Sequence, residues 1–572
     1  MGHNHNKRTI QRFLKKFGAV ILLSLAMLTV GCFSSGNRDV SHAQGATQHF
    51  AQSYYLSEKG NDQAAGTSRS TAWRTLERLN RQILGPCDRI QLEGGGFFEG
   101  PLVIDSNEKG SRVCPILVTT YGKGKAIIGV KNKPAVFTYN SEYISFRNLD
   151  LQAIRSQDIK ALENISGLEI VNDSPGNVQL RNILIEDITV HGFSGYGILV
   201  DGNNGKSGFT HVRISRVNTS ENSRGGIEVR GQFDKAARGY AHHDIFVTDS
   251  ISHDNPGLDN PLFGPTGSGI VLSDVQNGRV ERSEAYGNGY RCNSLEGGPV
   301  GIWAWDSDHI TIQNNYSHNN RTAGRLDGGG FDLDGGVTNS LMRYNISRGN
   351  DGAGYLFAQF PIARKFSDNA ARYNLSINDG RRNSYGAVYA FGNIENSLIY
   401  NNTIYIDSPA AGKPPALRLS KDSTQAMSIY NNIFIANGED LLSADIEEGQ
   451  QDLRMEANYF GNIGGSLNLK WKDILVHTLA EFKSLSNQER SMKRTDFNKA
   501  ARELFPSLAA KSPLEISSLS NAQLMTMLTS EKLKDLGLDL QKMFNIDTQN
   551  KDIRGKVAPN GVGYDLGSYE LP

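Results

Sequence analysis

The sequence predicts an all-β fold, a parallel β-helix in which the chain winds through a stack of similar coils. An asparagine recurs with a period near 30, as Asn315, Asn345, Asn374, Asn402 and Asn432. Each of these asparagines follows a short segment in which apolar and polar residues alternate, as they do in strands with one buried face. A strand pattern repeated at this period is typical of a solenoid. Tight two-residue hairpin turns, which a propeller or a sandwich would need, are missing from the pattern.

A second column of the repeat begins each time with a glycine. Its segments start at Gly197, Gly226, Gly269, Gly301, Gly330 and Gly354. The residue after each glycine is large and apolar, and in most segments so is the residue two places later, so these positions are expected to face the core. The remaining positions are expected to face solvent, and they include Glu228, Arg230, Trp303, Trp305, Asp332 and Asp334.

The composition limits the classes of function. The 572-residue chain has 60 basic and 60 acidic residues, and 61 glycines that suit many tight turns. Balanced charge argues against a polyanion-binding surface over the whole protein, so we expect no nucleic-acid partner. No nucleotide-binding loop, no Gly-x-Ser-x-Gly elbow and no metalloprotease helix is recognisable. We expect a monomer.

Residues 1–32 have the features of an export signal of the lipoprotein type. Basic residues precede an apolar run, which a glycine and Cys32 follow. Cys32 is the expected lipidation site, and ordinary cleavage after Ala43 is the alternative. Residues 33–53 then form a tether rich in small and polar residues. We therefore expect an extracytoplasmic protein, lipid-anchored at the outer membrane or cell surface, or secreted, that meets the membrane only through its anchor.

The expected β-helix covers residues 54–460. At its N-terminal end, residues 73–84 have helical spacing, with one face formed by Trp73, Leu76, Leu79 and Ile83. Such a helix would cap the open end of the solenoid, because a terminal coil would otherwise expose its core. Residues 461–572 form a mixed extension, with helical patterns followed by a closing segment over residues 552–570 that is expected to pack back on the solenoid.

Three cysteines remain after Cys32. Cys87 and Cys114 flank strand-like segments, and in an oxidising compartment they would form a disulfide; two unpaired buried thiols are the alternative. Cys292 is left over. No cysteine and histidine spacing indicates zinc, so we assign no metal ligands from spacing.

The residues with the clearest chemistry are Asp332 and Asp334, in a short strand between glycine turns. Alternation places both carboxylates on one face, about 6–7 Å apart at the backbone. Adjacent coils lie about 4.8 Å apart, so Trp303 is expected one coil before Asp332, and Trp305 one coil before Asp334. Exposed aromatic groups generally mark a binding site, and an indole suits the C–H face of a sugar ring. Two exposed indoles beside two exposed carboxylates therefore predict a carbohydrate site.

A third outward-facing column adds four more side chains, His253, Tyr286, His318 and Arg348. The loop after Arg348 contains Asp351. We expect His318, Arg348 and Asp351 to line one groove with the two aspartates, with Glu228 and Tyr355 as further substrate-binding residues. A structural ladder without a chemical role is the alternative for the histidines, and a structural pair with Asp351 is the alternative for Arg348.

Three functions fit these residues. Paired carboxylates are the machinery of glycoside hydrolysis, and their mutual repulsion keeps one of them protonated near neutral pH. In this interpretation Asp332 and Asp334 are the acid/base pair and the tryptophans bind sugar. The second interpretation is a lyase or epimerase of a uronate polymer, with Arg348 or His318 as base or neutralising group and the aspartates holding Ca²⁺. The third is a non-catalytic glycan-binding solenoid.

Two stretches resemble known families. The N-terminal order of strand, Gly-Asn-Asp, Gly-Thr-Ser, short helix and further strands resembles that of bacterial right-handed parallel β-helix proteins, the pectate-lyase-like group. The run from Asp327 to Gly336, followed by Asn345 and Gly352-Ala353-Gly354-Tyr355, resembles polysaccharide lyase family 9. Those enzymes are right-handed β-helices that act on pectic substrates with Ca²⁺. The resemblance implies this fold over about residues 54–440.

The local motif departs from that family at one position. The Brønsted-base lysine of the family 9 lyases corresponds to Asp332 here. An aspartate adds negative charge where a uronate is already negative, so the departure favours hydrolysis over elimination. Several glycoside hydrolase families share the fold and use aspartates on the same face. The resemblance therefore implies a polysaccharide substrate and a glycosidase, with a lyase as the second choice.

Overall fold

The computed structural model describes residues 50–571, except 155–163, 263, 384, 408–412, 421–425, 447–451, 491–500, 512, 531–532, 545–550 and 560–563. The expected signal, Cys32, Ala43 and nearly all of the expected tether lie outside these residues.

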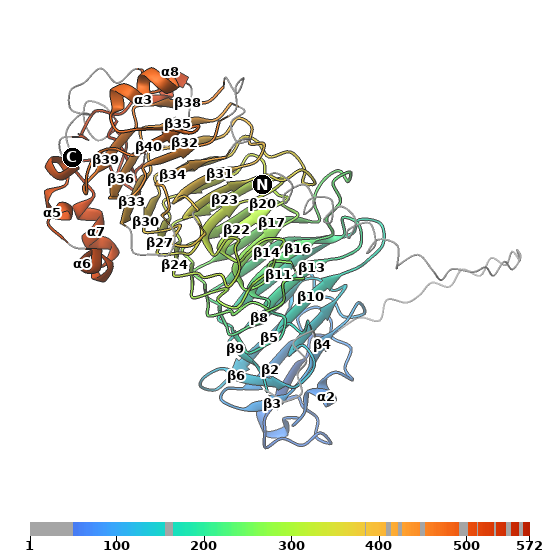
Figure 1. Ribbon diagram of the computed structural model, residues 1–572. Helices are drawn as coiled ribbons and strands as arrows, with labels where there is room; N and C mark the ends of the chain where they lie inside the picture. The colour runs from blue at the N-terminus through green and yellow to red at the C-terminus, as the bar shows by residue number, and fades with distance from the viewer. Residues whose placement is uncertain are drawn as a thin grey trace, which may run out of the picture. The chain divides into compact units, whose positions relative to one another are not determined.

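Three long sheets run along the stack of coils in the described part of the chain (Figure 1). Each full coil contributes one strand to each sheet, and strands of successive coils pair in parallel; the last two strands of the third sheet pair antiparallel. The predicted parallel β-helix is confirmed.

The first sheet consists of β1 (Ser53–Leu56), β2 (Arg89–Glu93), β5 (Ile116–Tyr121), β8 (Ile144–Arg147), β11 (Gln179–Glu186), β14 (Gly208–Ser215), β17 (His242–Thr248), β20 (Val275–Glu281), β23 (Asp308–Gln313), β26 (Leu341–Arg343), β29 (Ala370–Arg372), β32 (Leu398–Tyr400), β35 (Ser428–Tyr430) and β38 (Arg454–Glu456). The second consists of β3 (Phe97–Glu99), β6 (Ala126–Val130), β9 (Leu149–Ala153), β12 (Thr189–His191), β15 (Asn218–Ser220), β18 (Ile251–His253), β21 (Glu284–Tyr286), β24 (Tyr316–His318), β27 (Ile346–Arg348), β30 (Leu375–Ile377), β33 (Thr403–Asp407), β36 (Ile433–Asn437) and β39 (Tyr459–Asn462). The third consists of β4 (Leu102–Ile104), β7 (Val136–Tyr139), β10 (Leu168–Asn172), β13 (Tyr196–Gly202), β16 (Gly225–Gly231), β19 (Ser268–Ser273), β22 (Val300–Trp305), β25 (Gly329–Leu333), β28 (Tyr355–Ala358), β31 (Val388–Phe391), β34 (Leu417–Leu419), β37 (Leu442–Ala444), β40 (Leu469–Trp471) and β41 (Ile474–Val476).

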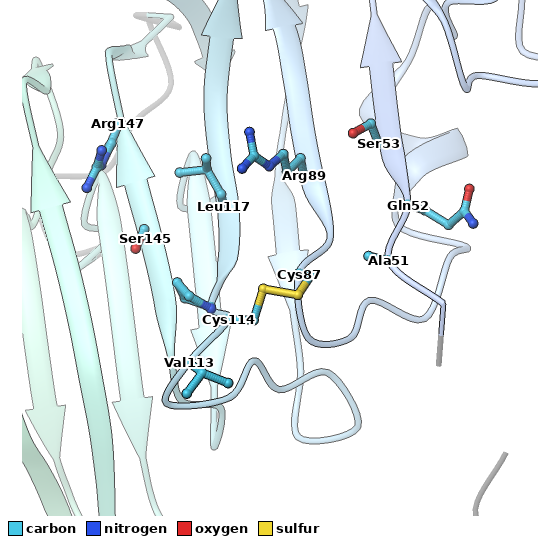
Figure 2. A pocket seen from close by; sticks show the side chains of 11 residues that line it. Ala51, Gln52, Ser53, Cys87, Arg89, Val113, Cys114, Leu117, Ser145 and Arg147 are labelled. Carbon is cyan, nitrogen blue, oxygen red and sulfur yellow. A yellow bond between two sulfur atoms is a disulfide. The ribbon is translucent and has the colours of Figure 1, made fainter. Parts of the chain in front are cut away.

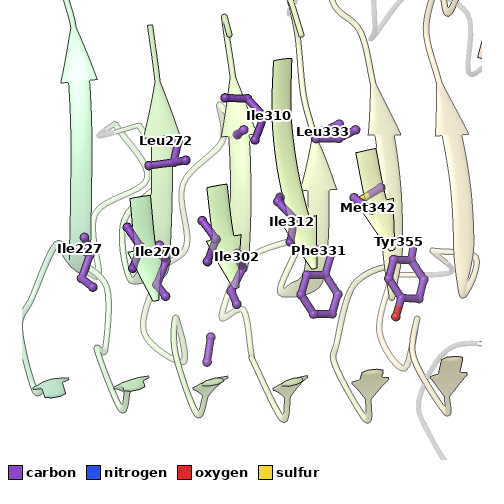
Figure 3. Close-up of a cluster of buried hydrophobic side chains, with 14 of the residues drawn as sticks. Ile227, Ile270, Leu272, Ile302, Ile310, Ile312, Phe331, Leu333, Met342 and Tyr355 are labelled. Carbon is purple, nitrogen blue, oxygen red and sulfur yellow. The ribbon is translucent and has the colours of Figure 1, made fainter. Parts of the chain in front are cut away.

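The glycine-led segments are strands of the third sheet, in the register that the sequence predicts. Ile198, Ile227, Ile270, Ile302, Phe331 and Tyr355 pair in succession from β13 to β28. All of them are buried in one continuous core. Figure 3 shows those from Ile227 to Tyr355 side by side in successive coils. Burial of each such side chain contributes roughly 1.5–3 kcal/mol relative to exposure. The alternate positions of these strands therefore form the outer face of the third sheet.

The recurring asparagines form a hydrogen-bonded ladder inside the turn before the second sheet. The side-chain amide of Asn315 donates to Oδ1 of Asn345 (3.1 Å), and that of Asn345 donates to Oδ1 of Asn374 (3.2 Å). The ladder continues through Asn402, Asn432 and Asn458 to a buried carboxylate, Glu489. The recurring asparagines therefore have a structural role, because their side chains join successive coils.

A second ladder, which the sequence analysis missed, lies in the turn between the second and third sheets. It runs through Asn222, Asn255, Asn288, Asn320 and Asn350 to the carboxylate of Asp379. Both ladders pair buried amides between coils, and such pairing fixes the register of the coils on either side.

Breaking a ladder should destabilise the fold. Asn345→Ala leaves the backbone N–H of Asn315 and the carbonyl of Ile312 without their side-chain partner. We expect the free energy of unfolding to fall by at least about 2 kcal/mol, because each buried polar group without a partner costs about 1–3 kcal/mol. Urea unfolding measures the change. Asn393→Ala, at an exposed turn, is the matched control; an equal loss there would contradict a special role for the ladder.

The N-terminal cap is shorter than the predicted helix. A 3-10 turn, η1 (Arg69–Thr71), precedes a single helical turn, α2 (Leu76–Leu79), which Thr75 caps by accepting a hydrogen bond from the backbone of Arg78. Trp73, Leu76 and Leu79 are buried, as predicted. Ile83 is 74% exposed, so its assignment to the same face is wrong, because the helix ends before it.

The C-terminal segment packs on the solenoid, as predicted for its closing part. Its helices are α3 (Leu479–Ser486), α4 (Ala501–Leu504), α5 (Pro506–Ala509), α6 (Pro513–Ser518), α7 (Asn521–Met527) and α8 (Leu540–Phe544). Phe482 of α3 packs edge-on against Trp471, at 5.6 Å between ring centres. In the closing segment, the backbone N–H of Gly567 donates to the carbonyl of Asn431, and that of Ser568 to Oγ1 of Thr403. Among the described residues, no helix is long and apolar enough to cross a membrane.

Cys87 and Cys114 form a disulfide, with their Cα atoms 4.8 Å apart, and Cys292 is a buried free thiol. The disulfide borders a hollow of about 510 Å³ on the outer face of the first sheet, beside β1, β2, β5 and β8 (Figure 2). Two arginines, Arg89 and Arg147, and no acidic residue line it. The hollow therefore does not contain the predicted acid pair, which lies on β25 and the turn after it.

Candidate active site

The outer face of the third sheet brings the predicted aspartates and tryptophans together. Asp332 pairs with Trp303 of the preceding coil. The backbone N–H of Asp334 donates to the carbonyl of Ala304 (2.9 Å), which continues the same register and places Trp305 one coil before Asp334. The predicted neighbourhood of the four side chains is confirmed.

The predicted exposure of this group is partly wrong. Asp332 is only 2% exposed and Trp303 only 9% exposed. The indole N–H of Trp303 donates to Oγ of Ser268 (3.1 Å), and the ring packs with Val271 and Val300. Large side chains before and after Asp332 in its column, Trp303 and Leu356, cover the short carboxyl. Asp334 and Trp305 keep part of their surface open to solvent.

A third carboxylate, Asp327, belongs to the same group and was not among the predicted site residues. It lies in the turn that leads into β25, where its backbone has a left-handed conformation (φ 48°). Its Oδ2 accepts a hydrogen bond from the backbone of Gly298 (2.6 Å), and its Oδ1 accepts one from the hydroxyl of Tyr385 (3.1 Å). Asp327 is partly exposed. The carboxylates open to solvent in this group are therefore Asp327 and Asp334, with Asp332 buried.

The three carboxyl groups differ in how strongly their surroundings oppose ionisation. Burial, and then the charges of Asp334 and Asp327, raise the pKa of Asp332 well above its usual range. Burial also raises the pKa of Asp334 to about 7, and the charge of Asp327 adds to it although the N–H of Gly335 lowers it. Burial raises the pKa of Asp327, whereas its two hydrogen-bond donors lower it. Near neutral pH, Asp327 is thus the best stabilised anion and Asp332 the neutral acid.

The burial of the Asp332 carboxyl predicts how the stability of the fold depends on pH. Its Oδ1 is buried and accepts no hydrogen bond from the described residues, a situation that favours the neutral form. In the unfolded chain the Asp332 carboxyl ionises above a pKa of about 3.9, whereas in the folded protein it stays neutral to a higher pH. The stability that the neutral carboxyl contributes at low pH is therefore lost as pH rises from the unfolded pKa toward the folded pKa.

Asp332→Asn should remove this loss, because the amide is neutral at every pH. We expect the variant to be more stable than the wild type at pH 8, by about 1 kcal/mol or more, and to differ little from it at pH 4. Urea unfolding at both pH values measures the difference. Asp473→Asn, at an exposed position, is the control. Equal stability of Asp332→Asn and wild type at pH 8 would show that Asp332 ionises freely in the folded protein.

His318 and Arg348 do not join this group. They follow one another in a column on the second sheet, not the third. Nε2 of His318 lies 2.9 Å from Glu284, and its ring stacks on Tyr286 and Tyr316. Arg348 donates to the carbonyl of Leu519 (2.7 Å) in the C-terminal segment. The prediction that they line one groove with Asp332 is therefore wrong, because alternation shows that a residue faces outward but not toward which side of the solenoid.

The remaining predicted binding residues are Tyr355, Asp351 and Glu228, and the surroundings of each are different. Tyr355 is 1% exposed, and its hydroxyl donates to the carbonyls of Asn345 and Leu375 inside the core, so its prediction as a binding residue is wrong. Asp351 accepts from the backbone of Thr322 and lies 3.5 Å from Arg321. These contacts place Asp351 beside the turn that leads into β25.

Glu228 does lie on the outer face of the third sheet. Register places it three coils before Asp332, through Val271 and Trp303, at about 14 Å from the coil spacing. Burial raises its pKa to about 8, although the charge of Arg230 lowers it. Glu228 is thus on the same face as the carboxylate group but outside direct contact with it.

The Ca²⁺ that the lyase resemblance implies does not fit the residues found. The described part of the chain holds no group of three or more histidine, cysteine or acidic side chains arranged to bind a metal ion. The groups that shift the pKa values of Asp327, Asp332 and Asp334 include no lysine or arginine. A uronate bound here would meet negative charge without a cation beside it.

Comparisons with known proteins agree with the fold. Residues 166–360 match the family described as the right-handed β-helix region. The chain is 25% identical over 505 residues to a lacto-N-biosidase of Bifidobacterium longum subsp. longum, a match that covers 73% of this chain and 30% of the relative. The chain thus spans about a third of the length of that curated relative.

One solved structure shows the same fold. The crystal structure of GH136 lacto-N-biosidase from Eubacterium ramulus superposes with a TM-score of 0.51 at 18% identity, over 72% of this chain and 67% of that one. Pectate lyase Pel9A gives a TM-score of 0.42 at 14% identity, over 92% of this chain and 97% of that one. The family match and the lacto-N-biosidase structure confirm the right-handed parallel β-helix that the sequence resemblance implies.

Proposed function

We propose that this protein is a glycoside hydrolase that acts on an extracellular oligo- or polysaccharide at the outer face of the third sheet. The observation that carries the proposal is the group of three carboxyl groups with separated ionisation, two of them open to solvent. Glycosidases need one carboxylic acid to protonate the leaving oxygen and one carboxylate to act as base or nucleophile. Surroundings that push the pKa values of two such groups apart supply both forms at one pH.

Asp334 is the proposed proton donor. Its pKa of about 7 keeps a large fraction protonated near neutral pH, and part of its side chain is open to solvent. Asp327 is the proposed carboxylate, because two hydrogen bonds stabilise its anion. The sequence analysis paired Asp334 with Asp332 instead. Burial makes Asp332 a neutral neighbour of the pair, and Trp305 provides the aromatic surface beside Asp334.

The lacto-N-biosidase likeness supports the reaction class and suggests the first substrates. A match that covers about a third of the relative does not carry its substrate over to this chain, so we propose neutral glycans as the class, with lacto-N-biosides to be tested first. The carboxylate group without a neighbouring cation supports neutral over uronate substrates. Export is part of the proposal, and the Cys87–Cys114 disulfide supports it, because disulfides persist in oxidising compartments.

The proposal is tested by incubating the protein with p-nitrophenyl lacto-N-bioside, lacto-N-tetraose and a panel of neutral and acidic polysaccharides, and following new reducing ends. We expect cleavage of at least one neutral oligo- or polysaccharide, and cleavage about a thousandfold slower by Asp334→Asn on the same glycan. Cleavage restricted to uronate polymers, or full activity of Asp334→Asn, would contradict the proposal.

A further inference from the structure

Two small apolar clusters lie on the outer face of the third sheet, apart from the core, one on each side of the carboxylate group. The first consists of Val271, Val300 and Trp303, with Trp305 packed against them. The second consists of Ala353, Leu356, Ala358 and Tyr389, with Tyr385 packed against them. Strands β19 and β22 provide most of the first cluster, and β28 and β31 most of the second, with β25 between them.

The column that contains Asp334 crosses both clusters. Trp305 precedes Asp334 by one coil, as shown above. Leu333 of β25 pairs with Phe357 of β28, and continuing this register places Asp334 one coil before Ala358. Ala358 in turn pairs with Phe391 of β31. The column therefore reads Trp305, Asp334, Ala358, Phe391. Three coil spacings separate the two aromatic residues, about 14 Å, which is room for more than one sugar ring.

The two aromatic residues at the ends of this column are open to solvent, unlike Trp303 and Tyr389 on the same face, which are each 9% exposed. Phe391 is 45% exposed, and Trp305 is partly exposed. Each is held from one side, Phe391 by Tyr389 at 6.0 Å between ring centres and Trp305 by Phe233 at 5.5 Å. Between them lie the partly exposed Asp334 and the short side chain of Ala358, which is 8% exposed. Each ring is therefore supported by a neighbour and still presents a free surface.

We propose that a neutral glycan chain binds along the axis of the solenoid, with sugar rings on both sides of the scissile bond. One side contacts Trp305 and the other contacts Phe391, and the bond to be cleaved lies over Asp334. This inference rests on the proposed hydrolase and adds to it that the substrate is an oligosaccharide bound on both sides of the cleavage point, with Phe391 as a specificity-determining residue. Apolar ring faces and the C–H faces of sugars are complementary, and the intervening carboxyl groups suit hydroxyls.

The test compares Phe391→Ala and Trp305→Ala on two substrates. Lacto-N-tetraose extends on both sides of the cleaved bond, whereas p-nitrophenyl lacto-N-bioside has only an aryl group on one side. Loss of a buried aromatic contact lowers affinity about tenfold or more. We expect kcat/KM of one variant to fall by about the same factor on both substrates. For the other variant, kcat/KM should fall by a factor about ten times larger on the tetrasaccharide than on the aryl glycoside, because the replaced ring contacts the sugars on the leaving-group side of the cleaved bond. If neutral polymers are the substrates cleaved, a polymer and its shortest cleaved aryl glycoside replace the pair.

Phe97→Ala is the matched control, since Phe97 is also an exposed phenylalanine (41%) but lies on the second sheet. If Phe391→Ala keeps the wild-type kcat/KM on the tetrasaccharide, or if Phe97→Ala lowers kcat/KM by the same factor as Phe391→Ala, the inference is overturned. Either result would leave the proposed hydrolase intact. The two proposals are separated by a glycan-array measurement on the wild type. Binding that Phe391→Ala abolishes, without any cleavage, would uphold the glycan-binding surface along this column and refute both the hydrolase and the scissile bond placed over Asp334. Neither binding nor cleavage of any glycan would refute both.

Discussion

Asp334→Asn should lower kcat on an oligosaccharide by about a thousandfold, because general acid catalysis contributes about 10²–10⁴-fold and the amide cannot donate the required proton. The loss on p-nitrophenyl lacto-N-bioside should be far smaller, since nitrophenolate leaves without protonation. Steady-state kinetics on the two substrates measures the contrast. A loss of equal size on both would show that Asp334 is not the proton donor.

A matched control for this variant is available in the same solenoid. Asp379 is also a buried carboxyl with a raised pKa, of about 6, but it ends the second asparagine ladder and lies apart from the carboxylate group. Asp379→Asn keeps an acceptor oxygen for Asn350, so we expect its kcat to stay within about twofold of wild type. This control separates the chemistry of Asp334 from the general effect of neutralising a buried acid.

Asp327→Asn should lower kcat by a similar factor, but about equally on the oligosaccharide and the aryl glycoside. The reason is that the carboxylate which acts as base or nucleophile is needed whatever the leaving group. The variant should also shift the pH profile of the residual activity. Wild-type activity falls as pH rises past about 7, the pKa of Asp334, because the proton donor ionises.

The direction of that shift follows from the charges. The negative charge of Asp327 raises the pKa of Asp334, so its replacement by an amide lowers that pKa. The alkaline limb of the profile should therefore move to lower pH. An alkaline limb that stays in place, or wild-type activity in Asp327→Asn, would show that Asp327 is outside the catalytic group.

The coils and their register could be predicted because they depend on local alternation and a nearly constant repeat. Phe331 and Ile302 face inward because each follows a glycine in a strand, and one such alignment fixes all positions of the sheet. The second asparagine ladder left a similar signal, since Asn222, Asn255, Asn288, Asn320 and Asn350 recur at gaps of 33, 33, 32 and 30.

The candidate site could be predicted only in part, because burial on the outer face depends on neighbours from other coils. Alternation alone predicts that Asp332 is exposed, whereas Trp303 and Leu356 on the adjacent coils cover it. Arg348 is held by the C-terminal segment, through a contact to Leu519 that spans 171 residues, and no local pattern carries such information. Asp327 lies in a turn outside the strand alternation, and its only sequence signal is its place before three glycines in the same acidic run.

The measurement that tests the hydrolase most directly is the mass of the products formed in H₂¹⁸O. Hydrolysis adds one water across the cleaved bond, so we predict products that carry one ¹⁸O at the new reducing end and no new double bond. Products that lack the added water and carry a double bond would mean elimination, and would contradict the roles proposed for Asp334 and Asp327.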